Sequence, residues 1–489
     1  MHFVCESGMS HCVLGTDREN PGNPPPCEAC IRQSRHLFAD GNVHWFKYSL
    51  DADLAADLKE LNVQDLSNFE CSRIKAPLVT PGRAVPLGSF VLPSIRWALR
   101  RHTLNDDEET RQLLRSYILS SYNIAQNFSA FLDEYKPSSV IIFNGTMFPE
   151  ATARWVVKAR GIRVITHEVG FQRFSAFFTD EEATAYPIHI PENFELTEVQ
   201  NRRLDNYLQD RFKGQFTMAG ISFWPEIRQL GDTILEKITH FRQVIPVFTN
   251  VVYDTSQVHA NTVFPHMFAW LNLVLEIIRA NPDTLFVIRA HPDEMRPGTR
   301  KISRESVAGW IEQNQVTNLP NVIFIDSQDY ISSYEVIKLS KFIMVYNSSI
   351  GMEAVLMGIP VLCGGKARYT QYPIVFFPQS IEEYREKAEE FISTSRIELP
   401  LEYLKNARQF LYFQLFRTSL SFGKYLEDGG RKGFVHLKPF SWEALLTENS
   451  PTLKVLVEGI TGKDANHRII PGYKIENTSS QFLVEDSLS

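Results

Sequence analysis

The sequence predicts an α/β protein with two Rossmann-like, doubly wound parallel-sheet domains and extra helices. Short apolar segments of strand length alternate with helical segments in two separate stretches, residues 138–167 and residues 243–363. Polar side chains follow most of the apolar segments, and ligands of such sheets bind where the strands end. A chain of 489 residues is also too long for one compact core, so at least two domains are expected.

The second stretch has the more regular pattern. Its apolar strands are QVIPVF, TLFVIR, NVIFID, KFIMVY and IPVLC, which begin at residues 243, 284, 321, 341 and 359. Helices are expected between them, through Trp270, near Val307, near Val336 and at Met352. Apolar strands that alternate with helices in this way predict a parallel sheet covered on both faces.

The first half of the chain is more varied. MHFVC and VHWFKYSL are expected to be strands, separated by a polar loop rich in Pro and Gly that holds Cys12, Cys27 and Cys30. A long helix is expected from Asp106 to Tyr135. SSVIIF, a helix ended by Gly161 and IRVITH then predict a strand–helix–strand unit.

Three segments are expected along the chain. Helices over about 195–241 connect an N-terminal α/β domain, residues 1–237, to a C-terminal domain, residues 238–425. Residues 426–489 are expected to form an extension that ends in a polar tail, because the stretch after Gly462 lacks periodicity.

Composition and charge exclude several classes of protein. A net charge of -7 and a pI near 6.0 argue against nucleic acid as a partner. One basic cluster, Arg96, Arg100, Arg101 and His102, is either a solvated helix end or a surface for anionic glycan or lipid. No apolar stretch has the length of a membrane span, and the N-terminus does not resemble a secretory signal. We therefore expect a cytoplasmic protein with six reduced cysteines.

Polar residues gather after the predicted strands. In the C-terminal half they are Asn250 with Asp254, Arg289 with His291, and Asn347, Ser348 and Ser349, and in the N-terminal half they are Asn144-Gly145 and His167-Glu168. Parallel strands end at one edge of a sheet, so each set is expected to lie together there.

The segment from Asn347 to Tyr369 predicts a phosphate site. Ser348, Ser349 and Gly351 come between a strand and a helix, where hydroxyls and backbone N–H groups bind phosphate. Glu353 lies one turn further, within reach of a ribose hydroxyl, and Lys366 adds positive charge. The alternative for the serines is helix capping, and for Glu353 a favourable charge in the first turn of a helix.

The segment from Val247 to Tyr369 resembles bacterial capsular polysaccharide biosynthesis proteins, GT-B glycosyltransferases related to capsule Kdo- and sialic-acid-transferring enzymes. The matching residues include Thr249-Asn250-x-x-x-Asp254, Arg289-x-His291-Pro292-x-Glu294, Ser332-Ser333-Tyr334, Tyr346-Asn347-Ser348-Ser349-x-Gly351-x-Glu353-Ala354, Gly358-x-Pro360-Val361 and Gly365-x-Ala367-x-Tyr369.

The resemblance implies two domains that face a cleft. It assigns His291, Ser348, Ser349 and Glu353 to the donor, often a CMP-sugar, and leaves the acceptor side to the N-terminal domain. Such a domain usually begins with a strand, a glycine-bearing loop and a helix. This chain opens within what resembles a later strand, so we expect either that its first β-α unit is missing or that the domain is unusually short.

Metal-independent transfer is expected, because positive charge and N–H groups can stabilise the leaving phosphate. His167 and Glu168 are the candidates for the base, and the alternative for this pair is a buried histidine beside a surface glutamate. Asp254 is a further candidate, either for catalysis or for holding a loop in place, since short aspartates often cap turns. Asp51 and Asp53 are expected to cap a helix rather than to hold a metal. A zinc site at Cys12, Cys27 and Cys30 is the less favoured alternative to structural thiols.

The expected function is transfer of a sugar from a nucleotide-sugar to a surface polysaccharide or its lipid-linked primer, in capsule or lipopolysaccharide biosynthesis. No cofactor is required, and peripheral association with the inner face of the cell membrane is expected. Two alternatives stay open. One is a CDP-alcohol phosphotransferase of the teichoic-acid type, and the other is a non-catalytic relative that binds glycan or nucleotide in a capsule-assembly complex.

Overall fold

The computed structural model describes residues 1–9, 11–12, 15–17, 20, 22–74, 84–213, 217–218, 221–222, 228–295, 302–430, 434–462 and 469–474. The chain divides into two compact units. The first comprises Met1–His167, Thr179–Thr184 and Tyr253–Val258, and the second comprises Glu168–Phe178, Ala185–Val252 and His259–Ser489. The expected bounds of 1–237, 238–425 and 426–489 stay a prediction.

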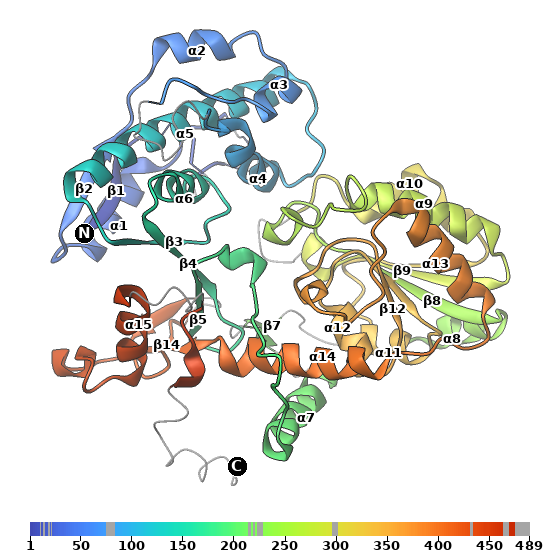
Figure 1. The fold of residues 1–489 in the computed structure, drawn as a ribbon. Helices are drawn as coiled ribbons and strands as arrows, with labels where there is room; N and C mark the ends of the chain where they lie inside the picture. Colours follow the sequence, from blue (N-terminus) through green and yellow to red (C-terminus); the bar gives the residue numbers. More distant parts are fainter. Residues whose placement is uncertain are drawn as a thin grey trace. The chain divides into compact units, whose positions relative to one another are not determined.

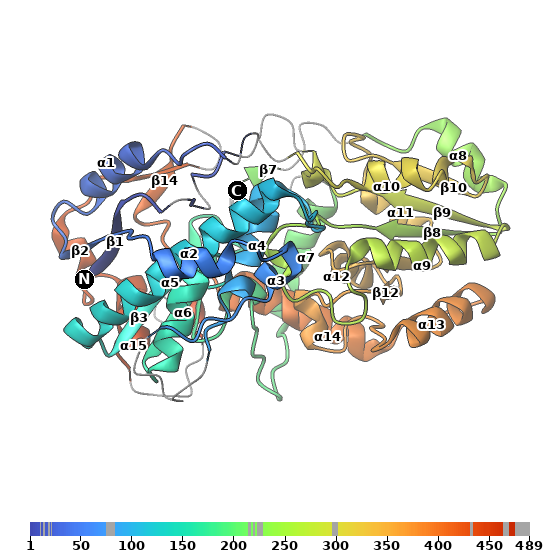
Figure 2. The same ribbon diagram turned by 90° about the horizontal axis from the view of Figure 1, so that it is seen from above.

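The first unit begins with a parallel strand pair, β1 (His2–Ser7) and β2 (Val43–Lys47), connected through helix α1 (Cys27–Leu37). Helices α2 (Ala52–Leu58), α3 (Val63–Ser67), α4 (Leu87–Leu99) and α5 (Glu108–Tyr135) follow. The predicted strand–helix–strand unit is present as β3 (Ser139–Phe143), α6 (Glu150–Ala159) and β4 (Arg163–Val169), with β3 and β4 parallel. Figure 2 shows α4, α5 and α6 packed together, and their apolar side chains form one core.

Side-chain caps explain where several helices of this unit begin. The carboxylate of Asp51 accepts a hydrogen bond from the Leu54 N–H at 2.9 Å, which confirms that Asp51 caps a helix. Asp107 accepts from the Thr110 N–H at 2.8 Å and starts the long α5. One expectation was wrong: Cys27 and Cys30 lie in α1 rather than in the Pro-rich loop. Three prolines precede the helix, and Pro26 is its N-cap.

The second unit contains a five-stranded sheet of order β10-β9-β8-β11-β12, parallel throughout. Its strands are β8 (Gln243–Phe248), β9 (Thr284–Arg289), β10 (Val322–Ile325), β11 (Ile343–Val345) and β12 (Val361–Cys363). Five predicted strands are therefore confirmed, in the order that characterises a doubly wound sheet.

Helices cover both faces of this sheet. Figure 1 shows α9 (Met267–Ala280) and α10 (Val307–Gln313) on one face and α11 (Ser333–Lys338) and α12 (Ile350–Leu356) on the other. The remaining helices of the unit are α7 (Glu198–Phe212), α8 (Asp232–Thr239), α13 (Ile381–Ser393), α14 (Leu401–Tyr412) and α15 (Pro451–Thr461). The predicted fold class, α/β with parallel sheets, is confirmed.

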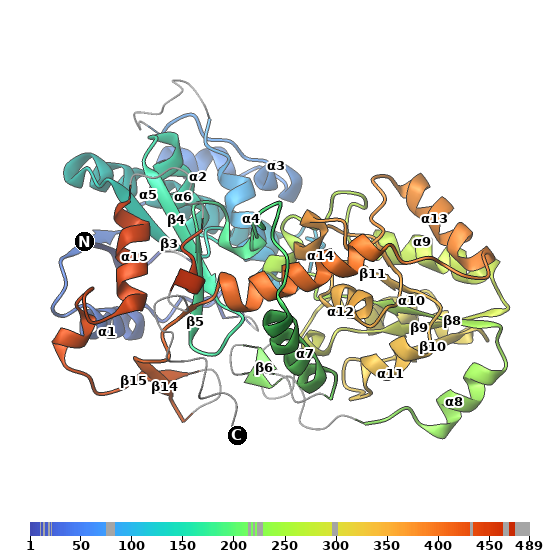
Figure 3. The same ribbon diagram turned by 60° about the horizontal axis from the view of Figure 1, so that its bottom comes forward.

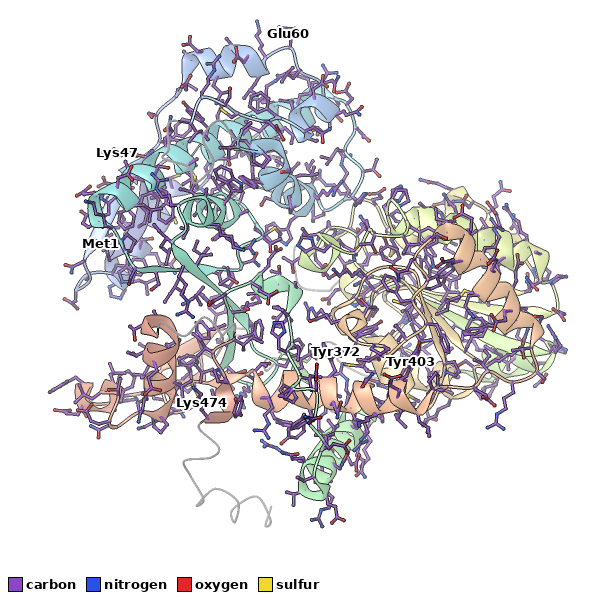
Figure 4. The ribbon with its side chains drawn as sticks, in the orientation of Figure 1. Met1, Lys47, Glu60, Tyr372, Tyr403 and Lys474 are labelled. Carbon is purple, nitrogen blue, oxygen red and sulfur yellow. The ribbon has the colours of Figure 1, made fainter. Side chains whose placement is uncertain are left out.

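Helix α14 joins several parts of the second unit. It lies beside α7 (Figure 3), where the Arg408 guanidinium donates to the Asp205 carboxylate at 2.7 Å. Tyr372 and Tyr403 lie at this helix in Figure 4. The Tyr372 hydroxyl donates to the Ile188 carbonyl at 2.9 Å, so the segment after residue 185 is fixed to the loop that follows β12.

Several short strands have no counterpart in the sequence-based expectation. They are β5 (Ser175–Thr179), β6 (Thr217–Met218), β7 (Ile221–Ser222), β13 (Leu420–Ser421), β14 (Leu426–Asp428) and β15 (Val435–Leu437). β13 pairs antiparallel with β5, in a sheet of strand order β13-β5-β4-β3. Within the described ranges, no helix is both long and apolar enough to cross a membrane.

Candidate functional site

The carboxyl edge of the five-stranded sheet collects the predicted donor residues. Because all five strands are parallel, their ends lie at the same edge. The residues that follow the strand ends are Thr249-Asn250 after β8, Ala290-His291 after β9, Asp326-Ser327 after β10, Tyr346 to Ser349 after β11, and Gly364 to Lys366 after β12.

The order in which the chain adds strands reverses between β8 and β11, and doubly wound sheets bind ligands at such a switch point. Asn250 follows β8 and Asn347 follows β11, and both side chains are buried. The Asn250 amide nitrogen Nδ2 donates to Asn347 Oδ1 at 2.7 Å, so the two predicted donor residues meet across this switch point. Two residues chosen only because they follow strands are thus direct neighbours.

Arg289 and His291 occupy the end of β9. Arg289 is 4% exposed, and its guanidinium donates to the Asp326 carbonyl. Burial lowers the pKa of Arg289 to about 10, against the opposing charges of Asp329 and Asp326, so the side chain stays positive at neutral pH. His291 Nδ1 accepts from the Asp293 N–H at 3.1 Å. A neutral His291 therefore carries its proton on Nε2, where it can donate to a phosphate oxygen.

Glu353 is held in a buried ion pair that the sequence did not predict. Its Oε1 accepts from Arg211 of α7 at 2.5 Å and from the Ser349 hydroxyl at 3.2 Å. The Tyr334 hydroxyl donates to Oε2 at 2.5 Å. Both carboxylate oxygens are thus engaged, although a ribose contact had been expected. Burial and the Glu353 charge raise the pKa of Tyr334 well above its ordinary value, so Tyr334 remains a donor.

The segment around Ser348 is shaped by close packing. The Tyr369 hydroxyl donates to the Ser348 carbonyl at 2.8 Å. A Cβ at Gly351 would meet that hydroxyl at 2.3 Å, so Gly351 is required by Tyr369. Neither serine side chain caps α12, because Ser349 donates to Glu353 instead. Lys366 is exposed beyond β12.

The candidate bases occupy different settings. His167 and Glu168 both lie inside β4, although the strand was expected to end there. Neighbouring residues of a strand point to opposite faces, so the two side chains cannot both face one acceptor. Burial lowers the pKa of His167, which favours its neutral form. Asp254 Oδ1 accepts from the Ser256 N–H at 2.9 Å and caps a short 3-10 turn, Thr255–Gln257.

In the first unit, the turn between β3 and α6 is tightly built. Asn144 and Gly145 both have positive φ, 62° and 81°. Asn144 Oδ1 accepts from the N–H groups of Thr146 and Met147 at 3.0 and 3.2 Å. A Cβ at Gly145 would lie 2.7 Å from Thr166. The predicted Asn144-Gly145 turn is therefore a rigid corner at the end of β3.

The cysteines and the basic cluster bear on the remaining expectations. Cys12, Cys27 and Cys30 are not disulfide-bonded, and no group of three or more His, Cys, Asp or Glu residues is gathered for a metal in the part of the chain that the structure describes. In the basic cluster, Arg100 is buried and Arg96 donates to the His102 carbonyl at 3.0 Å.

Arg211 and Tyr334 are the main residues of this site that the strand-end pattern missed. Arg211 lies in a polar helix far from any strand end, and nothing in its own sequence context marks it. The signal was at Glu353, a carboxylate inside the apolar sequence GMEAVL. A carboxylate buried in such a helix is either paired with a cation or neutralised by a raised pKa.

Comparison with known proteins gives one family match. Residues 226–390, about a third of the chain, match the model for "Capsule polysaccharide biosynthesis protein". This segment contains the whole five-stranded sheet and every predicted donor residue. A search of curated proteins finds no significant match.

Three solved structures illustrate the structural likeness. A Thermosulfurimonas dismutans KpsC beta Kdo 2,4 transferase is 12% identical, with 58% of this chain and 81% of that chain covered and a TM-score of 0.35. The beta Kdo 2,7 transferase of the same organism's KpsC is 15% identical, with coverage of 60% and 82% and a TM-score of 0.34. A Neisseria meningitidis UDP-GlcNAc 2-epimerase bound to UDP-GlcNAc is 17% identical, with coverage of 60% and 80% and a TM-score of 0.26.

TM-scores of this size do not fix a donor or an acceptor for this chain. The family match rests on sequence and coincides with the segment that carries the motifs. Residues 226–390 thus match the capsule polysaccharide biosynthesis proteins, and the resemblance that the motifs predicted is confirmed over this segment.

Proposed function

We propose that this protein is a glycosyltransferase that moves a sugar from a nucleotide-sugar, with a CMP-sugar favoured, to a surface polysaccharide or its lipid-linked primer. The observation that carries the proposal is the meeting of Asn250 and Asn347 at the switch point of the sheet, inside the segment that matches the capsule family. Ligands of doubly wound sheets bind at that point.

The donor is proposed to lie along the carboxyl edge of this sheet. His291 Nε2–H and the Ser348 hydroxyl are the donors proposed for phosphate oxygens, and the Lys366 ammonium adds charge. The Ser349 hydroxyl is proposed to join them by turning away from Glu353, to which it donates in the structure. Asn250 and Asn347 line the switch point. Arg289 and Glu353 are proposed to hold the surrounding backbone in place rather than to contact the donor, since both are buried and bonded to protein groups.

The proposed reaction needs no metal ion. The acceptor oxygen bonds to the anomeric carbon while the bond from that carbon to the phosphate oxygen breaks, and its electron pair stays on the phosphate. The proposed donors around His291 and Lys366 stabilise this charge. His167, Glu168 and Asp254 are the candidates from the sequence for the base that takes the acceptor proton. A cytoplasmic location at the inner face of the membrane would match a lipid-linked acceptor.

A turnover assay tests the proposal. The full chain is incubated with CMP-, UDP- and GDP-sugars and with capsule oligosaccharide acceptors, with and without EDTA, and released nucleotide is measured. We expect release from one nucleotide class, unchanged by EDTA. Phosphorus retained in the product would indicate a phosphotransferase instead, and release from none of the donors would overturn the proposal.

A further inference from the structure

Arg368 lies next to the proposed donor site, and no part of the proposed function uses it. It is half-buried and follows β12 in the chain. The hydroxyl of its neighbour Tyr369 donates to the Ser348 carbonyl at 2.8 Å. On the other side, the Gly365 N–H donates to the Tyr346 carbonyl at 2.6 Å. The segment that carries Arg368 is therefore held along the loop proposed to bind phosphate.

The backbone turns Arg368 and Lys366 to the same side of this segment. Ala367, the residue between them, has an extended conformation and is buried. Side chains alternate along an extended backbone, so the two cations lie on the side opposite to that of Ala367. Lys366 is exposed there and Arg368 is half-buried. The end of β12 thus presents two positive charges on one side.

In the part of the chain that the structure describes, neither cation forms an ion pair. Glu168 is a carboxylate in the same neighbourhood. Burial raises the pKa of Tyr186, and the charges of Arg368 and Glu168 act on that pKa in opposite directions. Arg368 and Glu168 are nevertheless not within ion-pair distance of each other. Positive charge without a counter-ion at a ligand-binding edge favours an anionic ligand.

Aromatic rings orient the Arg368 guanidinium. Its Cζ lies 4.2 Å from the ring centroid of Tyr186 and 5.7 Å from that of Phe171. Tyr186 is itself fixed, because its hydroxyl donates to the Val169 carbonyl at 2.7 Å. Contact with ring faces positions a guanidinium but satisfies none of its five N–H donors. Among the described residues, no acceptor is hydrogen-bonded to these donors.

The contact between the segment after β12 and the segment after residue 185 is closed by other side chains. The Gln371 amide donates to the Tyr186 carbonyl at 3.1 Å and accepts from the Ile188 N–H at 3.0 Å. The Tyr372 hydroxyl donates to the Ile188 carbonyl at 2.9 Å. Arg368 is therefore not needed to join the two segments, and its N–H donors are left for a ligand.

We propose that Arg368 binds a second oxyanion of the donor, next to the phosphate that is attached to the nucleoside. This assignment rests on the proposed nucleotide-sugar site. Paired N–H groups of a guanidinium match two oxygens of a phosphate or a carboxylate. The second oxyanion is either the second phosphate of a nucleoside diphosphate sugar or a carboxylate on the transferred sugar. Arg368 then distinguishes donors that carry such a group from donors that lack it.

Calorimetric titration of three probes into the full chain tests the proposal. CMP has one phosphate, CDP adds a second phosphate, and CMP-N-acetylneuraminate adds a carboxylate on the sugar. Wild type should bind one of the last two at least about tenfold more tightly than CMP, because a bidentate charged contact is added. Arg368→Gln should lose most of this gain while its affinity for CMP is unchanged. Arg368→Lys keeps the charge without the planar fork and should retain part of the gain.

Arg203→Gln is the matched control, because the Arg203 guanidinium also lies over an aromatic ring, 4.0 Å from that of Phe416, but belongs to α7 rather than to a strand end. It should bind all three probes as wild type does. In Arg368→Gln, loss of the CDP gain would identify a phosphate as the second oxyanion, and loss of the CMP-N-acetylneuraminate gain would identify a carboxylate.

Three results would overturn the assignment of Arg368 alone. They are an equal gain in wild type and Arg368→Gln, no gain over CMP with either larger probe, and an equal loss of affinity for all three probes in Arg368→Gln. A wild-type protein that binds none of the probes would overturn the proposed donor site as well.

Discussion

Two glutamates, one in each compact unit, follow a strand of a parallel sheet and lie in the first turn of a helix. Glu353 of α12 is 3% exposed, and Arg211, Tyr334 and Ser349 engage its carboxylate. Glu150 of α6 is half-buried, and Arg154, one turn further along the helix, pairs with Glu182 instead. In the first turn of a helix, glutamate therefore has a carboxylate paired with a cation in one unit and, within the described residues, one without an ion pair in the other.

The comparison shows two results of burying a carboxylate, one with a cation beside it and one without. A buried charge that is paired and hydrogen-bonded is held in one geometry. A desolvated carboxylate with no cation has its pKa moved towards neutrality. Glu353 is thus placed to hold α12 against α7, whereas burial raises the pKa of Glu150 to about 7.

The largest expected effect is the loss of stability when Glu353 loses its cation, Arg211. Arg211→Met leaves the Glu353 charge buried without its cation and should destabilise the second unit by about 3–5 kcal/mol. The double variant with Glu353→Gln should recover part of that loss. Differential scanning calorimetry measures both. Equal stability of wild type and Arg211→Met would show that the Arg211–Glu353 ion pair does not stabilise the second unit.

The second effect concerns pH-dependent stability at Glu150. Its pKa is raised to about 7 from an ordinary value of 4.5, so the folded state binds more protons than the unfolded state between these values. Stability therefore falls as pH rises through that window. Glu150→Gln lacks this loss, and its advantage over wild type should grow from about pH 5 to about pH 8, to at most about 3 kcal/mol.

Thermal unfolding midpoints at the two pH values measure this difference. Glu198→Gln is the control, because Glu198 is an exposed glutamate at the first position of α7, and its midpoint should equal that of wild type at both pH values. A difference between Glu150→Gln and wild type that is constant with pH would show that Glu150 ionises normally.

The smallest expected effect on stability comes from the hydrogen bond between Tyr334 and Glu353. Tyr334→Phe removes one hydrogen bond to the Glu353 carboxylate and should cost about 2 kcal/mol. Tyr135→Phe is the control, because Tyr135 is 40% exposed, and it should change stability by less than about 0.5 kcal/mol. Calorimetry of the two variants makes the comparison, and equal midpoints would mean that Tyr334 does not stabilise the buried charge.

Much of the fold could be predicted because apolar strands and helical periodicity are local signals. The five strands of the second unit were predicted from runs such as TLFVIR and KFIMVY. Strand ends also located Asn250 and Asn347, because parallel topology brings the residues after strands to one edge. Two- and three-residue strands such as β13 could not be predicted, since their pairing depends on distant partners.

The parts of the site that were missed depend on contacts between distant residues. Arg211 is 142 positions from Glu353 in the chain, and only folding brings them together. The desolvation of Glu150 could not be predicted either, because a glutamate at the start of a helix is usually a favourable surface charge. Its difference from Glu198 lies in burial and in the pairing of Arg154 with Glu182, neither of which local sequence specifies.

Calorimetric titration of CMP, UDP and GDP into wild type and His291→Ala tests the central claim most directly. His436→Ala is the control, since His436 is exposed in β15. The account predicts one nucleotide site per chain, with CMP preferred, and affinity at least about tenfold weaker in His291→Ala, equivalent to about 1.4 kcal/mol, because one hydrogen bond to phosphate is lost. Absence of nucleotide binding to wild type, or equal affinity in the two proteins, would contradict the assignment of the donor to the carboxyl edge of the five-stranded sheet.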